Sequence, residues 1–254
     1  MTQPPDRSLE RTRLAALDLR AAWEENAAEF VAWARRPGHD SYWQFHRDLF
    51  LELLPEPGRR TLDLGCGEGR LARDLKTRGH DVVGVDASRT MVAAARQADP
   101  ELDVRLADAA ALPFEDADFD LVVAFMSLQD VDNFELAVAE SARVLRARGH
   151  LCLAIVHPLS SAGRFEEEDA DSPFVVRGSY LERSYYMDSL RRDGLEVTFA
   201  SAHRPLQAYT DALADAGLLI ERVREPAVPE PVRTPRSRRW QRLPLFLHVR
   251  AVKR

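Results

Sequence analysis

A glycine-rich segment at residues 60–69, RTLDLGCGEG, constrains the fold of this chain more than any other stretch. Its first half is apolar, as in a short buried strand, and glycines follow at 65, 67 and 69. Glycine lets the backbone turn tightly and lets a ligand lie against bare peptide. Residues 70–75 then have the apolar spacing of a helix. The segment therefore predicts a strand, a ligand-binding turn and a helix, in that order.

The spacing of the glycines distinguishes between ligands. A dinucleotide-binding turn has the pattern G-x-G-x-x-G, with the phosphates at the helix N-terminus. Here the pattern is G-x-G-x-G, and Arg70 occupies the position of the third glycine. Asp63 ends the strand and Glu68 lies in the turn. Two acids beside the turn favour a cationic ligand such as S-adenosylmethionine, which carries an ammonium and a sulfonium, over a pyrophosphate.

Two more acids follow predicted strands. Asp86 ends the strand at 81–86, where a carboxylate can accept hydrogen bonds from both hydroxyls of a ribose. Asp108 follows the strand at 102–107, where it can accept a hydrogen bond from an adenine amino group. Three successive strands that end in an acid predict a site for a positively charged nucleoside.

These segments resemble the class I S-adenosylmethionine-dependent methyltransferases, and in particular the UbiE-like small-molecule group. The matching stretches are LDLGCGEG at 62–69, VDAS at 85–88, ADAAALPF at 107–114 and FDLVVAFMSLQD at 119–130. The resemblance covers residues 55–157 closely and the C-terminal part more loosely, where HRPLQAYTDALADAGLLIERVREP begins at residue 203.

The resemblance implies a Rossmann-like α/β sheet, mostly parallel with an antiparallel last strand. It implies S-adenosylmethionine as the cofactor and S-adenosylhomocysteine as the product. In the family the first acid and the glycines hold the methionine end, the second acid holds the ribose, and the third lies by the adenine. The expected cofactor residues are Asp63, Gly65, Cys66, Gly67, Asp86, Ala87, Ser88, Met91, Asp108, Ala109 and Met126.

Four parts of the chain are expected. Residues 1–55 form a helical lid, with a long helix over 8–36 and a second helix from Ser41 to about Leu54. Residues 56–158 form the cofactor-binding core, 159–203 an inserted substrate cap, and 204–254 complete the core sheet. No apolar run approaches the roughly 20 residues of a membrane helix, and no signal peptide is recognisable. We therefore expect a cytoplasmic protein without a membrane partner, either a monomer or a homodimer.

Aromatic residues in the predicted lid and cap suggest where a methyl acceptor binds. Trp23, Tyr42 and Trp43 are candidates for the walls of the acceptor cavity, although packing of the lid on the sheet explains them equally well. Aromatic walls suit an aromatic or cationic acceptor. We expect a small organic acceptor, and an aromatic or specialised metabolite is the favoured class.

A catalytic base is needed only if the acceptor arrives protonated. His157, at the predicted tip of the fifth strand, is the first candidate because imidazole accepts a proton near neutral pH. A histidine that makes only a loop hydrogen bond is the alternative. The other catalytic candidates are Asp130, Tyr180, Tyr185 and Tyr186. His157 and Tyr180 are also expected to contact the acceptor.

Other functions remain open on the sequence. A net charge of −6 disfavours a general nucleic-acid binder. The arginines between Arg233 and Arg242 could instead serve an RNA methyltransferase, but a solvated loop opposite the acidic insertion explains them better. A non-catalytic S-adenosylmethionine-binding module is a further alternative, and the glycine spacing disfavours an NAD enzyme. The two cysteines, Cys66 and Cys152, lack metal-ligand spacing, so no metal site is expected.

Overall fold

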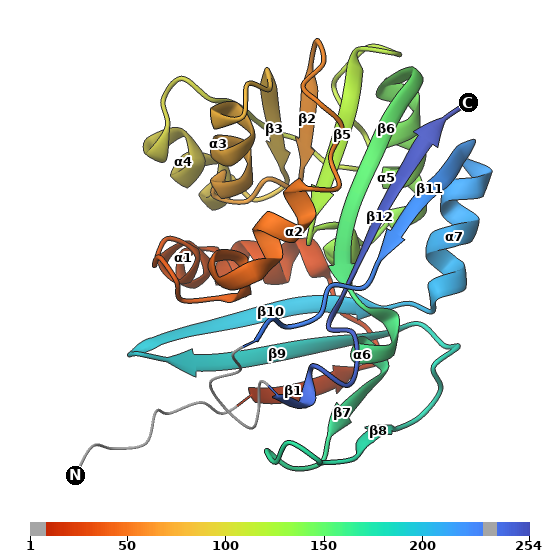
Figure 1. The fold of residues 1–254 in the computed structure, drawn as a ribbon. Coiled ribbons are helices and arrows are strands. Elements are labelled where there is room, and N and C mark those ends of the chain that lie inside the picture. The colour runs from red at the N-terminus through yellow and green to blue at the C-terminus, as the bar shows by residue number, and fades with distance from the viewer. Residues whose placement is uncertain (1–8, 231–237) are drawn as a thin grey trace.

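A computed structural model describes residues 9–230 and 238–254. Its core is a seven-stranded sheet with the strand order β11-β12-β6-β5-β2-β3-β4 (Figure 1). The bounds of these strands are β2 Thr61–Leu64, β3 Val82–Asp86, β4 Asp103–Leu106, β5 Phe119–Phe125, β6 Leu145–Val156, β11 Leu218–Arg224 and β12 Phe246–Lys253. β12 runs antiparallel to both of its neighbours, and the five strands from β6 to β4 are parallel. The expected mostly parallel sheet with an antiparallel last strand is confirmed.

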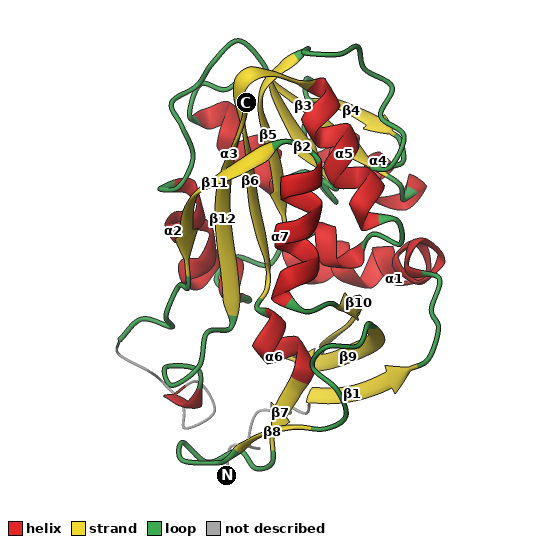
Figure 2. Ribbon diagram, turned by 90° about the vertical axis from the view of Figure 1, so that its right-hand side faces the viewer, coloured by secondary structure: helices red, strands yellow, loops and turns green. Residues whose placement is uncertain are grey.

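Helices cover both faces of this sheet, so β2 and β5 are buried along their whole length, as parallel strands usually are. On one face pack α5 (Phe134–Val144) and α7 (Leu206–Asp215). On the other pack α2 (Arg47–Leu51), α3 (Arg70–Thr77) and α4 (Arg89–Ala98). Figure 2 shows α5 and α7 on one side of the sheet and α2 and α3 on the other.

A second sheet lies across the carboxyl ends of the core strands. It contains β1 (Leu9–Leu14), β9 (Ser184–Arg192) and β10 (Leu195–His203), all antiparallel, in the order β1-β9-β10. Figure 1 shows it crossing beneath β5 and β6, with α1 (Leu19–Ala34) between it and α4. A segment from the start of the chain and one from the insertion therefore share one sheet.

The N-terminal elements differ from the expected helices. The predicted helix over 8–36 is wrong for residues 9–14, which form β1 against β9. The helix begins at Leu19, because Asp18 caps it by accepting a hydrogen bond from Ala21 N at 2.8 Å. The second helix opens as a π-helical turn, η1 (Tyr42–His46), and ends with α2 at Leu51.

The remaining elements are short. After β5 comes the 3₁₀ turn η2 (Leu128–Asp130). After β6 come α6 (Pro158–Ala162) and the hairpin of β7 (Gly163–Phe165) with β8 (Phe174–Val176). Within the described ranges, no helix is both long and apolar enough to cross a bilayer.

Candidate active site

The glycine turn after β2 has the geometry that its sequence predicts. Gly65, Gly67 and Gly69 have φ angles of +71°, +56° and +82°, a region that favours glycine. The amides of Gly65 and Cys66 donate to Val85 O at 2.8 and 2.9 Å, which ties the turn to β3. A Cβ on Gly65 would lie 2.5 Å from Ser127 Cβ, so the turn also leaves no room for a side chain.

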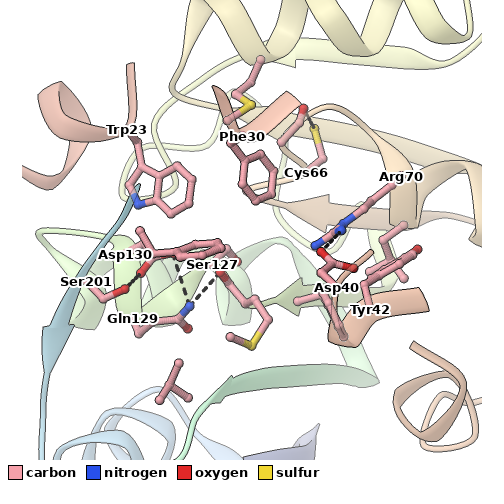
Figure 3. A pocket seen from close by; sticks show the side chains of 18 of the residues that line it. Trp23, Phe30, Asp40, Tyr42, Cys66, Arg70, Ser127, Gln129, Asp130 and Ser201 are labelled. Carbon is pink, nitrogen blue, oxygen red and sulfur yellow. Dashed lines mark hydrogen bonds and ion pairs between the residues drawn. The ribbon is translucent and has the colours of Figure 1, made fainter. Parts of the chain in front are cut away.

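A cavity of about 550 Å³ lies between this turn and the second sheet (Figure 3). Every residue predicted to hold the cofactor lines it. These are Asp63, Gly65, Cys66, Gly67, Asp86, Ala87, Ser88, Met91, Asp108, Ala109 and Met126. The three acidic strand ends are thus brought to one end of one cavity, and Met126 adopts a positive φ of 57° beside them.

Asp63 is the acid of the turn that lacks a counter-charge. Its side chain is 1% exposed, and Oδ2 has no hydrogen-bond partner among the described residues. Burial, with a smaller contribution from the nearby Asp86, raises the pKa of Asp63 to about 7. A cationic group in the cavity would satisfy this carboxylate.

Glu68, the other acid of the turn, is already neutralised. It is 1% exposed, and its carboxylate pairs with Arg35 at 3.0 Å and Arg73 at 2.7 Å. The interpretation of two free acids beside the ligand is therefore wrong for Glu68, which links α1 to α3 instead.

The tips of β3 and β4 are fixed by backbone hydrogen bonds. Asp86 accepts from Gly67 N at 2.8 Å and from Ser88 N at 2.9 Å, and burial raises its pKa. Asp108 accepts from Ala110 N at 2.9 Å and lies 3.7 Å from Arg20 of α1. Each carboxylate oxygen that accepts one bond can accept a second, so both acids can still receive a ligand hydroxyl or amino group.

Aromatic side chains also line the cavity, and Phe30 adjoins the glycine turn, since a Cβ on Gly67 would lie 3.7 Å from Phe30 Cε1. Trp23, Phe30 and Phe199 form an edge-to-face cluster with ring centroids 5.3 to 6.3 Å apart, and Trp23 Nε1 donates to Ala200 O at 2.8 Å. Tyr42 also lines the cavity, and its hydroxyl donates to Asp74 at 2.7 Å. Trp43 is not among the described lining residues, and its Nε1 donates to Ala34 O at 3.0 Å.

A polar cluster also lines the cavity, and three of its members, Gln129, Asp130 and Ser201, are labelled in Figure 3. Asp130 accepts from Ser201 Oγ at 2.6 Å and from Gln129 Nε2 at 3.3 Å, and burial raises the pKa of Asp130 well above its usual value. Gln129 Oε1 and the hydroxyl of Tyr186 are buried without a hydrogen-bond partner among the described residues. Burial also raises the pKa of Tyr186, so its hydroxyl stays neutral. The cluster offers both an acceptor and a donor to a ligand.

The structure separates the remaining catalytic candidates from the cavity. Among the described lining residues, His157, Tyr180 and Tyr185 are absent. His157 Nδ1 accepts from Leu159 N at 3.1 Å, and Nε2 lies 3.0 Å from Glu225. The Tyr180 hydroxyl accepts from Leu206 N at 3.1 Å. Tyr185 packs under Arg183, whose Cζ lies 5.1 Å from the ring centroid. The expected place of His157 beside the transferred methyl group is therefore corrected: His157 caps α6 instead.

His157→Ala is accordingly expected to change the rate of methyl transfer by less than about threefold, because loss of a positioned general base costs far more, roughly 10²- to 10⁴-fold. Burial lowers the pKa of His157, and its two ring nitrogens already have partners. Steady-state rates at saturating cofactor test this. A hundredfold drop in kcat with an unchanged melting temperature would show that His157 takes part in methyl transfer.

Several cavity residues were not predicted. Arg70 pairs with Asp40 at 2.7 Å and lies over the Tyr42 ring at 4.1 Å, which joins the start of α3 to the segment before η1. Its place at the third-glycine position was the only sequence signal available. Phe30 and Ser201 lie in segments without a local motif, and Ser127 and Gln129 lie in the matching stretch 119–130 but drew no site prediction, so only the fold brings the four together.

The predicted basic cluster is partly described. Arg233 and Arg236 lie outside the described residues. Arg239 donates to Glu167 O, and Arg242 donates to Ala170 O and Ser172 O, both at 3.0 Å. These two arginines thus bind the acidic insertion, as expected of a loop opposite it.

Comparison with known proteins agrees with this geometry. Residues 62–153, from β2 to β6, match the family model of a methyltransferase domain. Residues 62–153 therefore form a methyltransferase domain. A crystal structure of an S-adenosylmethionine-dependent methyltransferase from Mesorhizobium loti aligns with 84% of this chain and 98% of its own, with a TM-score of 0.69 and 26% identity.

Two curated relatives match about half of this chain. Demethylmenaquinone methyltransferase of Beutenbergia cavernae is 38% identical over 117 residues, which are 46% of this chain and 48% of the relative. A probable S-adenosylmethionine-dependent methyltransferase of Mycobacterium tuberculosis is 34% identical over 141 residues, 54% of this chain and 50% of the relative. The chain spans about half the length of the curated relatives it matches.

The cofactor of these methyltransferases is S-adenosylmethionine, and the residues present fit it. The unpartnered Oδ2 of the Asp63 carboxylate suits an ammonium or sulfonium charge. The bare turn at Gly65 and Gly67 admits a ligand backbone, and Asp86 retains accepting capacity for ribose hydroxyls. No phosphate-binding third glycine is present, since Arg70 stands there in an ion pair.

Proposed function

We propose that this protein transfers the methyl group of S-adenosylmethionine to a small, largely apolar organic acceptor. One observation carries the proposal: the acidic glycine turn, with the unpartnered Oδ2 of Asp63, lines the same cavity as several aromatic side chains and the unpartnered polar atoms of Gln129 and Tyr186. The acidic turn suits the cationic nucleoside. The aromatic side chains and the unpartnered polar atoms suit a flat acceptor with one polar substituent.

The cofactor, when bound, supplies a methyl group already activated by the sulfonium charge. A lone pair of the acceptor then forms the new bond to the methyl carbon, and the electrons of the broken bond stay on sulfur. The protein's contribution is to align the acceptor and to exclude water. Trp23, Phe30 and Phe199 provide the dry wall, and Gln129 and Tyr186 hold the polar substituent of the acceptor.

Of the predicted catalytic residues, Asp130 and Tyr186 remain candidates for proton transfer, because both line the cavity. Burial raises the pKa of Asp130 well above its usual value, which makes its carboxylate a stronger base than that of an exposed aspartate. A carboxylate there accepts a proton that the acceptor loses on methylation. Ser201 and Gln129, which both donate to Asp130, fix its orientation.

A turnover screen tests the proposal. Purified protein and S-adenosylmethionine are mixed with demethylmenaquinone, simple phenols, arylamines and an RNA oligonucleotide, and formation of S-adenosylhomocysteine is measured. A relative named demethylmenaquinone methyltransferase motivates the first acceptor. We expect turnover with a flat organic acceptor. Cofactor binding without any turnover would instead support a binding module, and turnover of RNA alone would support the RNA hypothesis.

Asp86→Ala tests the nucleoside end of the cavity. The substitution removes the acceptor of the ribose hydroxyls and also frees the amides of Gly67 and Ser88. We expect cofactor affinity to fall by about 1–3 kcal/mol, the range for lost hydrogen bonds to a charged group. Calorimetric titration measures this. An unchanged affinity would remove the ribose assignment from Asp86.

A further inference from the structure

Two buried histidines meet at the wall of the cavity. His46 ends the π-helical turn η1 and is 1% exposed, and His248 lies in β12 and is fully buried. Their Nε2 atoms are 2.8 Å apart. The His46 ring stacks on Phe246, with centroids 3.7 Å apart and an interplanar angle of 7°, and it lines the cavity. Neither histidine has a role in the site described above.

The hydrogen-bond partners of the pair determine which nitrogens carry protons. Burial lowers the pKa of both rings, that of His248 to about 4, so each is neutral and carries one proton. His248 Nδ1 is buried and has no partner among the described residues. A buried N–H without a partner is rarer and costlier than an unpaired acceptor. His248 therefore carries its proton on Nε2 and donates to His46 Nε2.

The proton of His46 must then lie on its other nitrogen. His46 Nδ1 makes no hydrogen bond with a described residue, and the ring lines the cavity. The pair thus presents a neutral N–H donor whose tautomer is fixed from behind by His248. The positive charge of Arg70 also disfavours a positive charge on the His46 ring.

The position of His46 places this donor near the reacting end of the cofactor site. Its ring centroid lies 4.6 Å from that of Phe125, the last residue of β5, and the next residue, Met126, lines the cofactor end. On the other side, Phe45 and Phe246 extend the apolar wall. A flat ring lying against this wall would direct a substituent toward His46.

We propose that His46 Nδ1–H donates a hydrogen bond to the oxygen of the methyl acceptor, and that this acceptor is an aromatic compound with a phenol-type oxygen bound in its ionised form. This inference rests on the proposed function and names its substrate class. His46 is then a substrate-orienting residue, and His248 is a positioning residue that acts through it. An N–H donor binds an anionic oxygen more strongly than a neutral one, so this donor favours the phenolate over the neutral phenol or an aryl ether.

The tautomer is testable without any substrate. Two-bond ¹H–¹⁵N correlation spectra of the histidine rings, assigned with His46→Gln and His248→Gln, report which nitrogen is protonated. We expect His46 protonated on Nδ1 and His248 on Nε2 at neutral pH. His46 found with its proton on Nε2 would overturn the proposal.

The ligand class is tested with 4-nitrophenol, whose absorbance reports its ionisation, in the presence of saturating S-adenosylhomocysteine. We expect the wild-type complex to bind 4-nitrophenol as phenolate, and at least about tenfold more tightly than 4-nitroanisole, as a hydrogen bond to an anion predicts. His46→Phe should abolish that preference. His46→Gln keeps an N–H donor and should therefore restore part of the preference for the phenolate. This second variant keeps the test decisive if His46→Phe misfolds.

His80→Gln is the matched control. His80 is also buried, but its Nδ1 lies 3.0 Å from Thr61 Oγ1 at the start of β2, and it is not among the described residues of the cavity. This variant should bind the probe like wild type. Equal binding of phenolate and ether by wild type, or no effect of His46→Phe, would overturn the inference while cofactor binding persists. Failure of S-adenosylhomocysteine itself to bind would instead reject the proposed function.

Discussion

Calorimetric titration of an Asp63→Asn variant is expected to show S-adenosylmethionine affinity reduced about 100-fold or more. Asp63 is 1% exposed and has an oxygen without a partner, so it meets a cationic ligand in a site of low polarity. Removing one member of a buried charge pair costs about 3–5 kcal/mol. Asparagine keeps the shape of the side chain, so the loss reports the charge.

The same carboxylate makes binding depend on pH. Burial raises the pKa of Asp63 to about 7, so the protonated, neutral form grows as the pH falls through that value. Only the ionised form attracts the cation, so wild-type affinity should be lost as the pH falls from 8 to 6, approaching about tenfold per pH unit below the pKa. Asp63→Asn should remove this dependence.

Asp108→Asn is the matched control, because it makes the same change at the same end of the cavity. The Asp108 side chain is 45% exposed, so water screens its charge. We expect its effect on affinity to be no more than severalfold. Equal losses in the two variants, or none in Asp63→Asn, would contradict the assignment of Asp63 as the counter-charge.

Gly65→Ala is expected to lower the free energy of unfolding by about 2–5 kcal/mol and to abolish cofactor binding. Two costs add. A residue with a side chain at a φ of +71° costs about 1–2 kcal/mol. The new Cβ would also meet Ser127 Cβ at 2.5 Å, and overpacking of this kind costs about 1–3 kcal/mol. Urea unfolding measures the sum.

Gly217→Ala separates the two costs. Gly217 has nearly the same φ, +72°, but a Cβ there meets nothing within 4 Å. The free energy of unfolding of this control should fall only by the cost of the backbone conformation, and the control should bind the cofactor normally. If the two variants were equally stable, the contact between the new Cβ and Ser127 would contribute nothing to the loss of stability in Gly65→Ala.

The local parts of the site could be predicted because their signals lie within short stretches. The turn at Gly65 and the acids at the strand tips are each encoded by a few consecutive residues, and a parallel sheet brings such tips to one edge. The acceptor end could not be predicted in this way. Tyr185 and Tyr186 are adjacent in β9 and therefore point to opposite faces, so only the register with Ser201 decides that Tyr186 faces the cavity.

The errors have the same origin. The sequence predicts a helix for residues 9–14 and gives no local sign of a strand, because their strand partner, β9, begins 170 residues later in the chain. The place of His157 at a strand tip is visible in the sequence, which makes it a predicted base, whereas the sequence makes no such prediction for His46. His46 acquires its partner from β12 and its orientation from a π-helical turn, and neither has a local signature.

The shared sheet of β1 and β9 has a consequence for engineering the acceptor preference. Arg11 of β1 donates two hydrogen bonds, of 2.7 and 2.6 Å, to the carboxylate of Asp188 in β9. Its guanidinium also donates to the carbonyl oxygens of Ser160 and Gly163 at the end of α6. A graft of the insertion alone from another enzyme would arrive without the strand that completes it. The second sheet is therefore built from two distant pieces of chain, which would have to be transplanted together.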